Sequence, residues 1–163
     1  MNPPRLATAW LSGCSGCHMS LLNMHQNLLE ILEQCNLVYS PLMDIKEYPR
    51  EVDIALVEGA VGNGGNREMA QTIRQRTKVV ISLGDCAVNG NVSALRNPVG
   101  LAAALKCSYG ENSWKAGLTK LEENVLPLHH VIRVDAFIPG CPPDAAEIRQ
   151  AIDDQLKRFR QNK

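Results

Sequence analysis

The sequence lacks the features that direct a protein to nucleic acid or to a membrane. Its 17 basic and 17 acidic side chains leave a formal net charge of zero, so there is no basic surface for a phosphate backbone or an anionic bilayer. No apolar run approaches the roughly 20 residues that cross a bilayer. The N-terminus has no basic stretch followed by an apolar segment, and no twin-arginine pair precedes Trp10. We therefore expect a cytoplasmic protein that binds no nucleic acid and has no membrane span.

The sequence also lacks internal repeats, low-complexity tracts and linkers. Its 163 residues are the length of one domain, and its composition of 45% hydrophobic and 21% charged residues is that of a folded globular protein. We predict a single domain over residues 1–163.

Apolar runs that end in glycine alternate with segments of helical period along most of the chain. This alternation predicts an α/β fold, a doubly wound parallel sheet of the flavodoxin-like kind. The expected strands are residues 6–11, 37–42, 53–57, 78–83 and 131–137, and the expected helices are residues 18–34, 66–76 and a last one starting near Pro143.

The stretch from residue 89 to residue 127 is the least regular part of the sequence. We expect a helix at about residues 98–106 and an exposed polar loop at residues 108–114. Connections of this length usually have a function, so we predict that this stretch packs against a partner, as does the helix at residues 18–34.

Six cysteines separate into two groups by their place on this map. Four come just after the ends of predicted strands: Cys14, Cys17, Cys86 and Cys141. Since the carboxyl ends of parallel strands share one edge, where ligands bind, these four should converge. Cys35 and Cys107 lie elsewhere, and we assign both to packing. In a reducing cytosol none of the six should form a disulfide.

Four convergent thiolates could hold zinc or an iron–sulfur cluster. One close pair joined by two distant single cysteines favours a cluster set into a preformed fold over a zinc ribbon, which uses two close pairs. Gly13, Gly16 and Gly140 flank the cysteines and would let the backbone approach a bulky inorganic group and direct N–H groups at it.

Three other interpretations of these cysteines remain open at this point. Cys14 and Cys17 could form a thioredoxin-like redox pair, and the chain would then be a thiol oxidoreductase. The four could bind zinc in a module for protein interaction, or they could be core residues.

Four ordered motifs resemble those of the small, electron-transferring subunit of nickel–iron hydrogenases. They are W-L-x-G-C-x-G-C at residues 10–17, V-E-G-A at 57–60, G-D-C-A-x-x-G at 84–90 and P-G-C-P-P at 139–143. The match is strongest to the cytoplasmic, bidirectional NAD-reducing hydrogenases, and it runs from Leu6 to about Ile152. A homologous subunit of respiratory complex I is more distant, because its adjacent cysteine pair is missing here.

The resemblance implies that Cys14, Cys17, Cys86 and Cys141 bind one proximal [4Fe–4S] cluster facing a nickel–iron large subunit. Electrons from dihydrogen would pass to flavin- and NAD-binding diaphorase subunits, or in another hydrogenase of this kind to ferredoxin. Periplasmic relatives carry two further clusters in a second domain, whereas this sequence has no more cysteines after Cys141, so we expect one cluster only.

Other residues near the motifs have less defined roles. Glu58, at the end of a strand on the same edge, is a candidate for orienting the site. Many relatives have an acidic residue two positions after the second cysteine, near a proton route. Met19 stands there in this sequence, so no proton relay is assigned to it. His18 could begin the helix or touch the cluster, and a polar group at a helix end is the expected role.

A flavin or a nicotinamide on this chain has little support from the residues. Cys14 to Cys17 occupy the loop that binds phosphate in flavodoxin-like folds, although the glycines at residues 62–65 could approach an FMN ring. No G-x-G-x-x-G follows a strand. We expect FMN and NAD on partner subunits, so NAD enters only through the resemblance.

Overall fold

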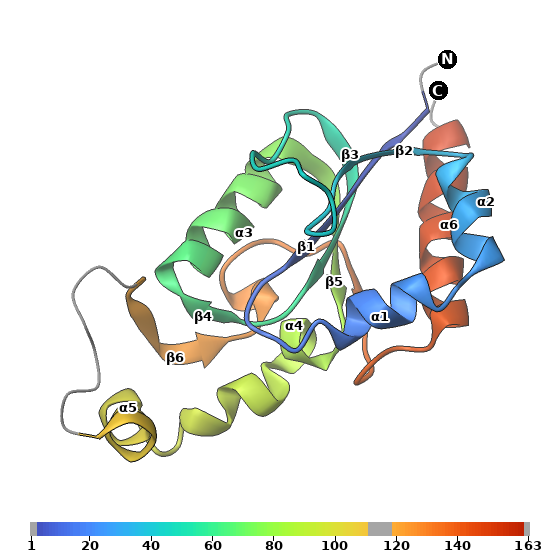
Figure 1. Ribbon diagram of the computed structural model, residues 1–163. Coiled ribbons are helices and arrows are strands. Elements are labelled where there is room, and N and C mark those ends of the chain that lie inside the picture. Colours follow the sequence, from blue (N-terminus) through green and yellow to red (C-terminus); the bar gives the residue numbers. More distant parts are fainter. Residues whose placement is uncertain (1–2, 111–118, 162–163) are drawn as a thin grey trace.

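A computed structural model describes residues 3–110 and 119–161. At its centre is a five-stranded parallel sheet with the strand order β2-β1-β3-β5-β7 (Figure 1). The strands are β1 (Arg5–Trp10), β2 (Asn36–Tyr39), β3 (Val52–Glu58), β5 (Thr77–Leu83) and β7 (Ala136–Ile138). This order is that of flavodoxin-like folds, which confirms the predicted fold class.

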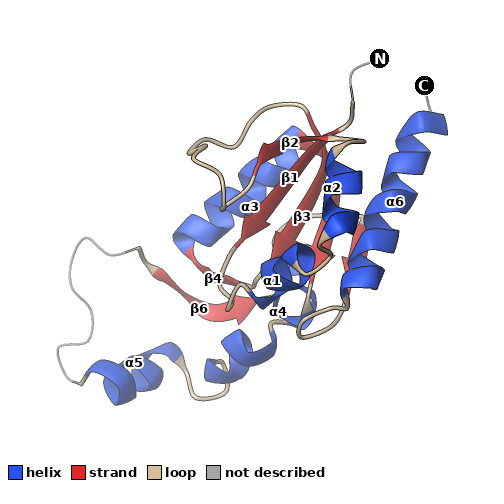
Figure 2. Ribbon diagram, turned by 45° about the vertical axis from the view of Figure 1, so that its right-hand side comes forward, coloured by secondary structure: helices blue, strands red, loops and turns tan. Residues whose placement is uncertain are grey.

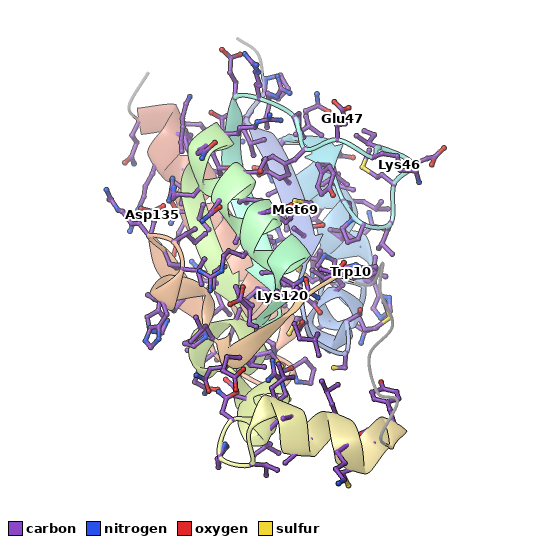
Figure 3. The ribbon with its side chains drawn as sticks, turned by 90° about the vertical axis from the view of Figure 1, so that its left-hand side faces the viewer. Trp10, Lys46, Glu47, Met69, Lys120 and Asp135 are labelled. Atoms are coloured by element: carbon purple, nitrogen blue, oxygen red, sulfur yellow. The ribbon has the colours of Figure 1, made fainter. Side chains whose placement is uncertain are left out.

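Helices cover both faces of the sheet (Figure 2). α3 (Gly64–Arg76) lies on one face, and α1 (Gly16–Leu22), α2 (Gln26–Leu32) and α6 (Ala145–Gln161) lie on the other. Figure 3 looks onto the face that α3 covers, with Met69 labelled on that helix. α4 (Asp85–Asn89) begins directly after β5, at the carboxyl edge of the sheet.

Two separate cores follow from the alternation of side chains along the buried strands. Ala55, Val57 and Val80 point to the α3 face and pack with Ile73. Their neighbours Ile54, Leu56 and Ile81 point to the opposite face, where Ile152 of α6 is also buried. Both faces of the central strands are apolar, which is why they read as continuous apolar runs in the sequence.

The sequence did not predict a second sheet next to α3. β4 (Val61–Asn63) pairs antiparallel with β6 (Leu121–Leu126). The 3₁₀ helix η1 (Asn91–Arg96) is attached to this pair, because Arg96 donates to the carbonyl of Glu123 at 2.9 Å and Asn97 and Val125 exchange two hydrogen bonds of 2.8 Å. β4 is too short to give a pattern that sequence reading could detect.

α5 (Leu101–Tyr109) extends away from the body of the protein, at the end opposite to the two termini. It starts three residues later than predicted, after Gly100 at a φ of 88°. Consequently Ser108 and Tyr109 belong to this helix, which corrects the polar loop expected from residue 108. Gly110 follows the helix as its C-cap, and residues 111–114 of the expected loop lie outside the described residues.

Several predicted elements have different bounds in the structure. The strand expected at residues 37–42 is β2, which ends at Tyr39. The helix expected at residues 18–34 is broken between α1 and α2, where His25 has a φ of 49°. The break lets Leu21, Met24 and Ile31 all reach the same core. The last strand begins at Ala136 instead of residue 131, after the 3₁₀ helix η2 (Leu128–His130) and a loop. α6 begins at Ala145, and the Asp144 carboxylate accepts the N–H of Ala146.

Within the described parts of the chain, no helix is both long enough and apolar enough to cross a membrane.

Candidate metal centre

The four strand-end cysteines line one pocket of about 140 Å³ at the carboxyl edge of the sheet. Cys14 and Cys17 follow β1, Cys86 is in the first turn of α4 after β5, and Cys141 follows β7. The structure therefore brings together the four cysteines that sequence analysis selected. Gly13, Gly16, Gly140 and Glu58, the other site residues selected from the sequence, line the same pocket.

The pocket opens onto the surface of this chain. Cys17 and Cys86 are partly buried, whereas Cys14 and Cys141 are exposed. A group held by all four sulfurs would therefore be enclosed by protein on one side and open on the other.

Two glycines are required by the packing of the cysteine loops. Gly84 leaves room for the Cys17 sulfur, and Gly140 leaves room for the turn that carries Cys141. A Cβ on Gly84, which has a φ of 79°, would overlap the Cys17 sulfur. Gly140 has a φ of 128°, and a Cβ there would lie 2.6 Å from the Cα of Pro143. Side chains at either position would displace a cysteine loop.

The thiols are close enough to oppose one another's ionisation. Burial raises the pKa of Cys17 to about 12, and the charges of Glu58, Cys86, Cys14 and Cys141 contribute to that rise. Burial also raises the pKa of Cys86, assisted by Cys141, Cys14 and Glu58 and opposed by a hydrogen bond with Ser93. Four thiolates could therefore coexist here only around a group of positive charge.

The donor set of four thiols is one that a metal cluster can use. No group of three or more His, Cys, Asp or Glu side chains among the described residues is arranged to hold one metal ion. Four thiols around a pocket of this size suit a group with several metal atoms, each bound by one sulfur. A tetrahedral zinc ion would require all four sulfurs within about 2.3 Å of one point.

Glu58 forms a buried pair with His18 next to the cysteines. One carboxylate oxygen, Oε2, accepts the backbone N–H of His18 at 2.7 Å and lies 2.6 Å from its ring Nδ1. The side chains are 2% and 0% exposed. The ring packs edge-on against Trp10, with centroids 5.3 Å apart. His18 is thus a polar group in the first turn of α1, at the helix end where we expected it, and it is fully buried.

Two sets of hydrogen bonds that sequence reasoning missed connect the cysteine loops. Asp85 Oδ1 accepts the N–H of Gly140 at 2.7 Å, and the Asp85 N–H donates to the Gly140 carbonyl at 2.9 Å. The Ser20 hydroxyl donates to the Pro143 carbonyl at 2.5 Å, which joins α1 to the same loop. Asp85 next to Cys86 was the available signal, but nothing in the sequence shows that it reaches Gly140.

The two remaining cysteines lie away from the pocket and differ from each other. Cys35 is 5% exposed and its sulfur lies 3.2 Å from the Ile31 carbonyl, which confirms the assignment to packing. Cys107 is exposed on α5, so its assignment to packing is wrong. The helix extends further than predicted and turns this side chain to solvent.

The glycine-rich stretch at residues 62–65 runs from the end of β4 into the first turn of α3. The Asn63 side chain accepts the N–H of Asn66 at 2.8 Å and so caps α3. Its sequence is thus explained by the β4–α3 turn, and it needs no flavin ring to account for it.

Comparison with known proteins places the chain in a family. Residues 14–154 match the family described as NADH ubiquinone oxidoreductase, 20 Kd subunit. The NAD-reducing hydrogenase HoxS subunit delta of Cupriavidus necator is 37% identical over 161 residues, which cover 92% of this chain and 77% of that protein. A subunit of the F420-non-reducing hydrogenase of Methanothermobacter marburgensis is 39% identical over 163 residues, which cover 91% of this chain and 53% of that protein. The chain spans about half the length of this second relative.

Solved structures agree with these relatives. One chain from the crystal structure of an NAD⁺-reducing [NiFe]-hydrogenase in the H₂-reduced state superposes with a TM-score of 0.87 and 36% identity. The match covers 95% of this chain and 92% of that one. A [NiFeSe] hydrogenase from Desulfovibrio vulgaris Hildenborough has a TM-score of 0.65 at 16% identity and shows a similar fold only. The chain therefore belongs to the family of the 20 kDa subunit of NADH–ubiquinone oxidoreductase and, within it, to the small subunits of nickel–iron hydrogenases.

Proposed function

We propose that this chain is an electron-transfer subunit that holds one [4Fe–4S] cluster through Cys14, Cys17, Cys86 and Cys141. The observation that supports this most directly is that three separate strand ends bring these four cysteines to one pocket. Residues 1–163 would then be a single iron–sulfur domain, in a reducing, cytoplasmic compartment where all six cysteines stay unpaired, as they are in the structure.

A bound [4Fe–4S] cluster would supply a group that accepts and releases one electron at a time. The residues of the chain supply what surrounds it. The four cysteines supply the thiolate ligands. Gly13, Gly16 and Gly140 keep side chains out of the pocket, so that backbone can approach the sulfurs. Hydrogen bonds and burial are the means by which a protein sets the potential of such a group.

The position of Cys86 and Cys141 disfavours the alternative of a metal-free thiol oxidoreductase. A redox dithiol needs only Cys14 and Cys17, so it gives no role to the two other cysteines that line the same pocket. As ligands of one metal group, all four cysteines have a role.

The exposed side of the pocket suggests where a nickel–iron large subunit would bind. Met19 and Leu22 on α1 are 47% and 40% exposed, and Trp10 at the end of β1 is 39% exposed. Val92 and Leu95 of η1 are more exposed still, at 66% and 70%. We propose that a large subunit covers this edge, together with the α1–α2 layer and the η1–α5 region that we predicted from the sequence.

The onward path of the electrons is proposed from the relatives. The Cupriavidus relative and the superposed structure are both named NAD-reducing, which supports diaphorase subunits that carry flavin and NAD as further partners. The net reaction would convert dihydrogen and NAD⁺ into NADH and a proton. The Methanothermobacter relative is named for a different class of hydrogenase, so ferredoxin or another carrier is the alternative acceptor.

Metal analysis of the purified complex tests this proposal. The chain is copurified with its native partners, iron, acid-labile sulfide and nickel are measured, and EPR spectra are taken after reduction. We expect about four iron and four sulfide per chain, in line with a [4Fe–4S] cluster, with nickel in a partner. Zinc, or no metal at this site, would refute the proposal. One equivalent of FMN bound to this chain would refute the placement of flavin on partners.

A further inference from the structure

We infer that Glu58 and Asp85 are positioning residues that hold the cysteine loops by their backbone N–H groups, and that Glu58 also lowers the reduction potential of the cluster. This inference rests on the proposed function and extends it to two side chains that are not metal ligands.

Each carboxylate accepts an N–H next to a cysteine that comes from another strand end. Glu58, at the end of β3, binds the N–H of His18, which follows Cys17, at 2.7 Å. Asp85, after β5, binds the N–H of Gly140, which precedes Cys141, at 2.7 Å. In both cases a loop is fixed at its cysteine by a charge-assisted hydrogen bond. The distances between the sulfurs therefore depend on these two carboxylates.

Three hydrogen-bonded connections form a chain around the pocket. The Glu58 carboxylate connects β3 to the start of α1, and the hydroxyl of Ser20 connects α1 to Pro143. Asp85 then connects the Cys141 loop to the start of α4, through two hydrogen bonds with Gly140. Each cysteine-bearing loop is thereby connected to at least one other, which prepares the site before metal enters it.

Glu58 differs from Asp85 because it is buried with no Lys or Arg against it among the described contacts. Its partner is the ring of His18, whose Nε2 is buried without a hydrogen bond in the described structure. Glu58 Oε2 thus accepts the N–H of His18 with no guanidinium or ammonium group beside it among the described contacts.

A fixed negative charge beside the cysteines opposes the addition of an electron. Reduction adds one negative charge to a group that four thiolates already make negative, and the low-dielectric interior screens this repulsion little. Glu58 lines the pocket with the cysteines. Removal of its charge should therefore make the cluster easier to reduce.

The first test is the variant Glu58→Gln in the purified complex, studied by EPR-monitored redox titration. Glutamine keeps an oxygen for the N–H of His18 but has no charge. We expect a normal iron content and about a tenfold higher ratio of reduced to oxidised cluster at a fixed potential, which equals 59 mV for one electron. The control is Glu122→Gln. Glu122 lies on β6 and pairs with Arg67 of α3, and it does not line the cysteine pocket. Its replacement should leave the potential unchanged.

The second test separates a positioning role from general destabilisation. We expect Asp85→Ala to lose more than half of its iron and sulfide, and Asp85→Asn to retain them, because asparagine still accepts from Gly140. The matched control is Asp135→Ala. Asp135 likewise accepts a backbone N–H, from Val80 at 2.8 Å, but near the start of β7. This control should keep its cluster.

Each outcome supports or overturns a defined part of the inference. A Glu58→Gln potential equal to that of the wild type overturns the charge role. Full iron in Asp85→Ala, or equal loss in Asp135→Ala, overturns the positioning role. If the wild-type chain itself holds no iron or sulfide, the proposed function fails first, and the variants are not needed to show it.

Discussion

Single glycines and cysteines at the pocket determine whether a metal group fits. For Gly84 and for Cys141 the chain offers a residue of the same type, away from the pocket, that serves as a control. Gly84 and Gly100 have nearly the same backbone conformation, with φ values of 79° and 88°. Only Gly84 is next to a sulfur. At Gly100 a Cβ would meet nothing within 4 Å among the described atoms.

Gly84→Ala should therefore lose the metal site, whereas Gly100→Ala should not. Both variants carry the cost of an alanine at positive φ and extended ψ, a region that essentially only glycine adopts, on the order of 1–3 kcal/mol, so their denaturation midpoints should fall. The overlap of the new methyl group with Cys17 occurs only at Gly84. Iron content after purification measures the difference. Equal iron in the two variants would mean that the Cys17 loop moves freely to accommodate the methyl group.

Cys141→Ser should abolish the EPR signal of a reduced cluster, because serine replaces one of four thiolate ligands. Cys107→Ser is the control, since Cys107 is exposed on α5 and does not line the pocket. It should leave iron, sulfide and hydrogen-dependent reduction unchanged. A Cys141→Ser protein that kept thiol–disulfide exchange activity through Cys14 and Cys17 would instead support the dithiol oxidoreductase.

At the scale of helices and strands, one carboxylate joins α3, β5 and the start of β7. Asp135, labelled in Figure 3, accepts the N–H of Val80 at 2.8 Å and pairs with Arg74 at 2.6 Å. Burial alone would raise the pKa of Asp135, but the Val80 N–H and the Arg74 guanidinium together hold it below its usual value of 3.8. The ionised form is therefore the one that stabilises the fold.

The stability that Asp135 contributes should be present at neutral pH and lost in acid. A group with a lowered pKa stabilises the folded state above its usual pKa and loses this effect as the pH falls through the folded value. Urea unfolding should show Asp135→Asn to be less stable than the wild type at pH 7, with a difference that shrinks below about pH 4. A difference that stayed constant with pH would indicate a hydrogen-bonding role without charge.

At the scale of the whole molecule, several large apolar side chains are exposed to solvent in this single chain, although side chains of this kind are usually buried. Met19 and Leu22 are next to the cysteine edge, and η1 and α5 extend from the body beyond it. None of the residues of α5 is buried in the described structure. Such surfaces are typical of subunits that bind partners.

Met19→Glu should weaken copurification with a nickel-containing partner without unfolding the chain. Met19 is 47% exposed on α1, so a charge there would cost little in the free chain but much in a desolvated interface. Ile45→Glu is the control, because Ile45 is 41% exposed in the loop between β2 and β3, outside the surface proposed for the large subunit. Nickel per chain after affinity purification is the readout. Equal nickel in Met19→Glu and the wild type would place the partner elsewhere.

Sequence patterns predicted this fold well where a segment is long and buried on both sides. The continuous apolar runs of β3 and β5 and the helical period of α3 are strong local signals, and the structure has each within a few residues. The patterns failed where tertiary contacts outweigh local preference. Examples are the break at His25, the short strand β4, and the delayed start of β7, each of which depends on packing against distant residues.

Sequence alone determined which cysteines belong together, because strand ends of one parallel sheet must share an edge. It also determined the family, through motifs whose residue types have a chemical purpose. Only the tertiary structure decided how the site is held. The Glu58–His18 pair joins residues 40 positions apart, and Asp85 and Gly140 are separated by 55. Such hydrogen bonds arise from the three-dimensional approach of loops, which no local pattern in a single sequence encodes.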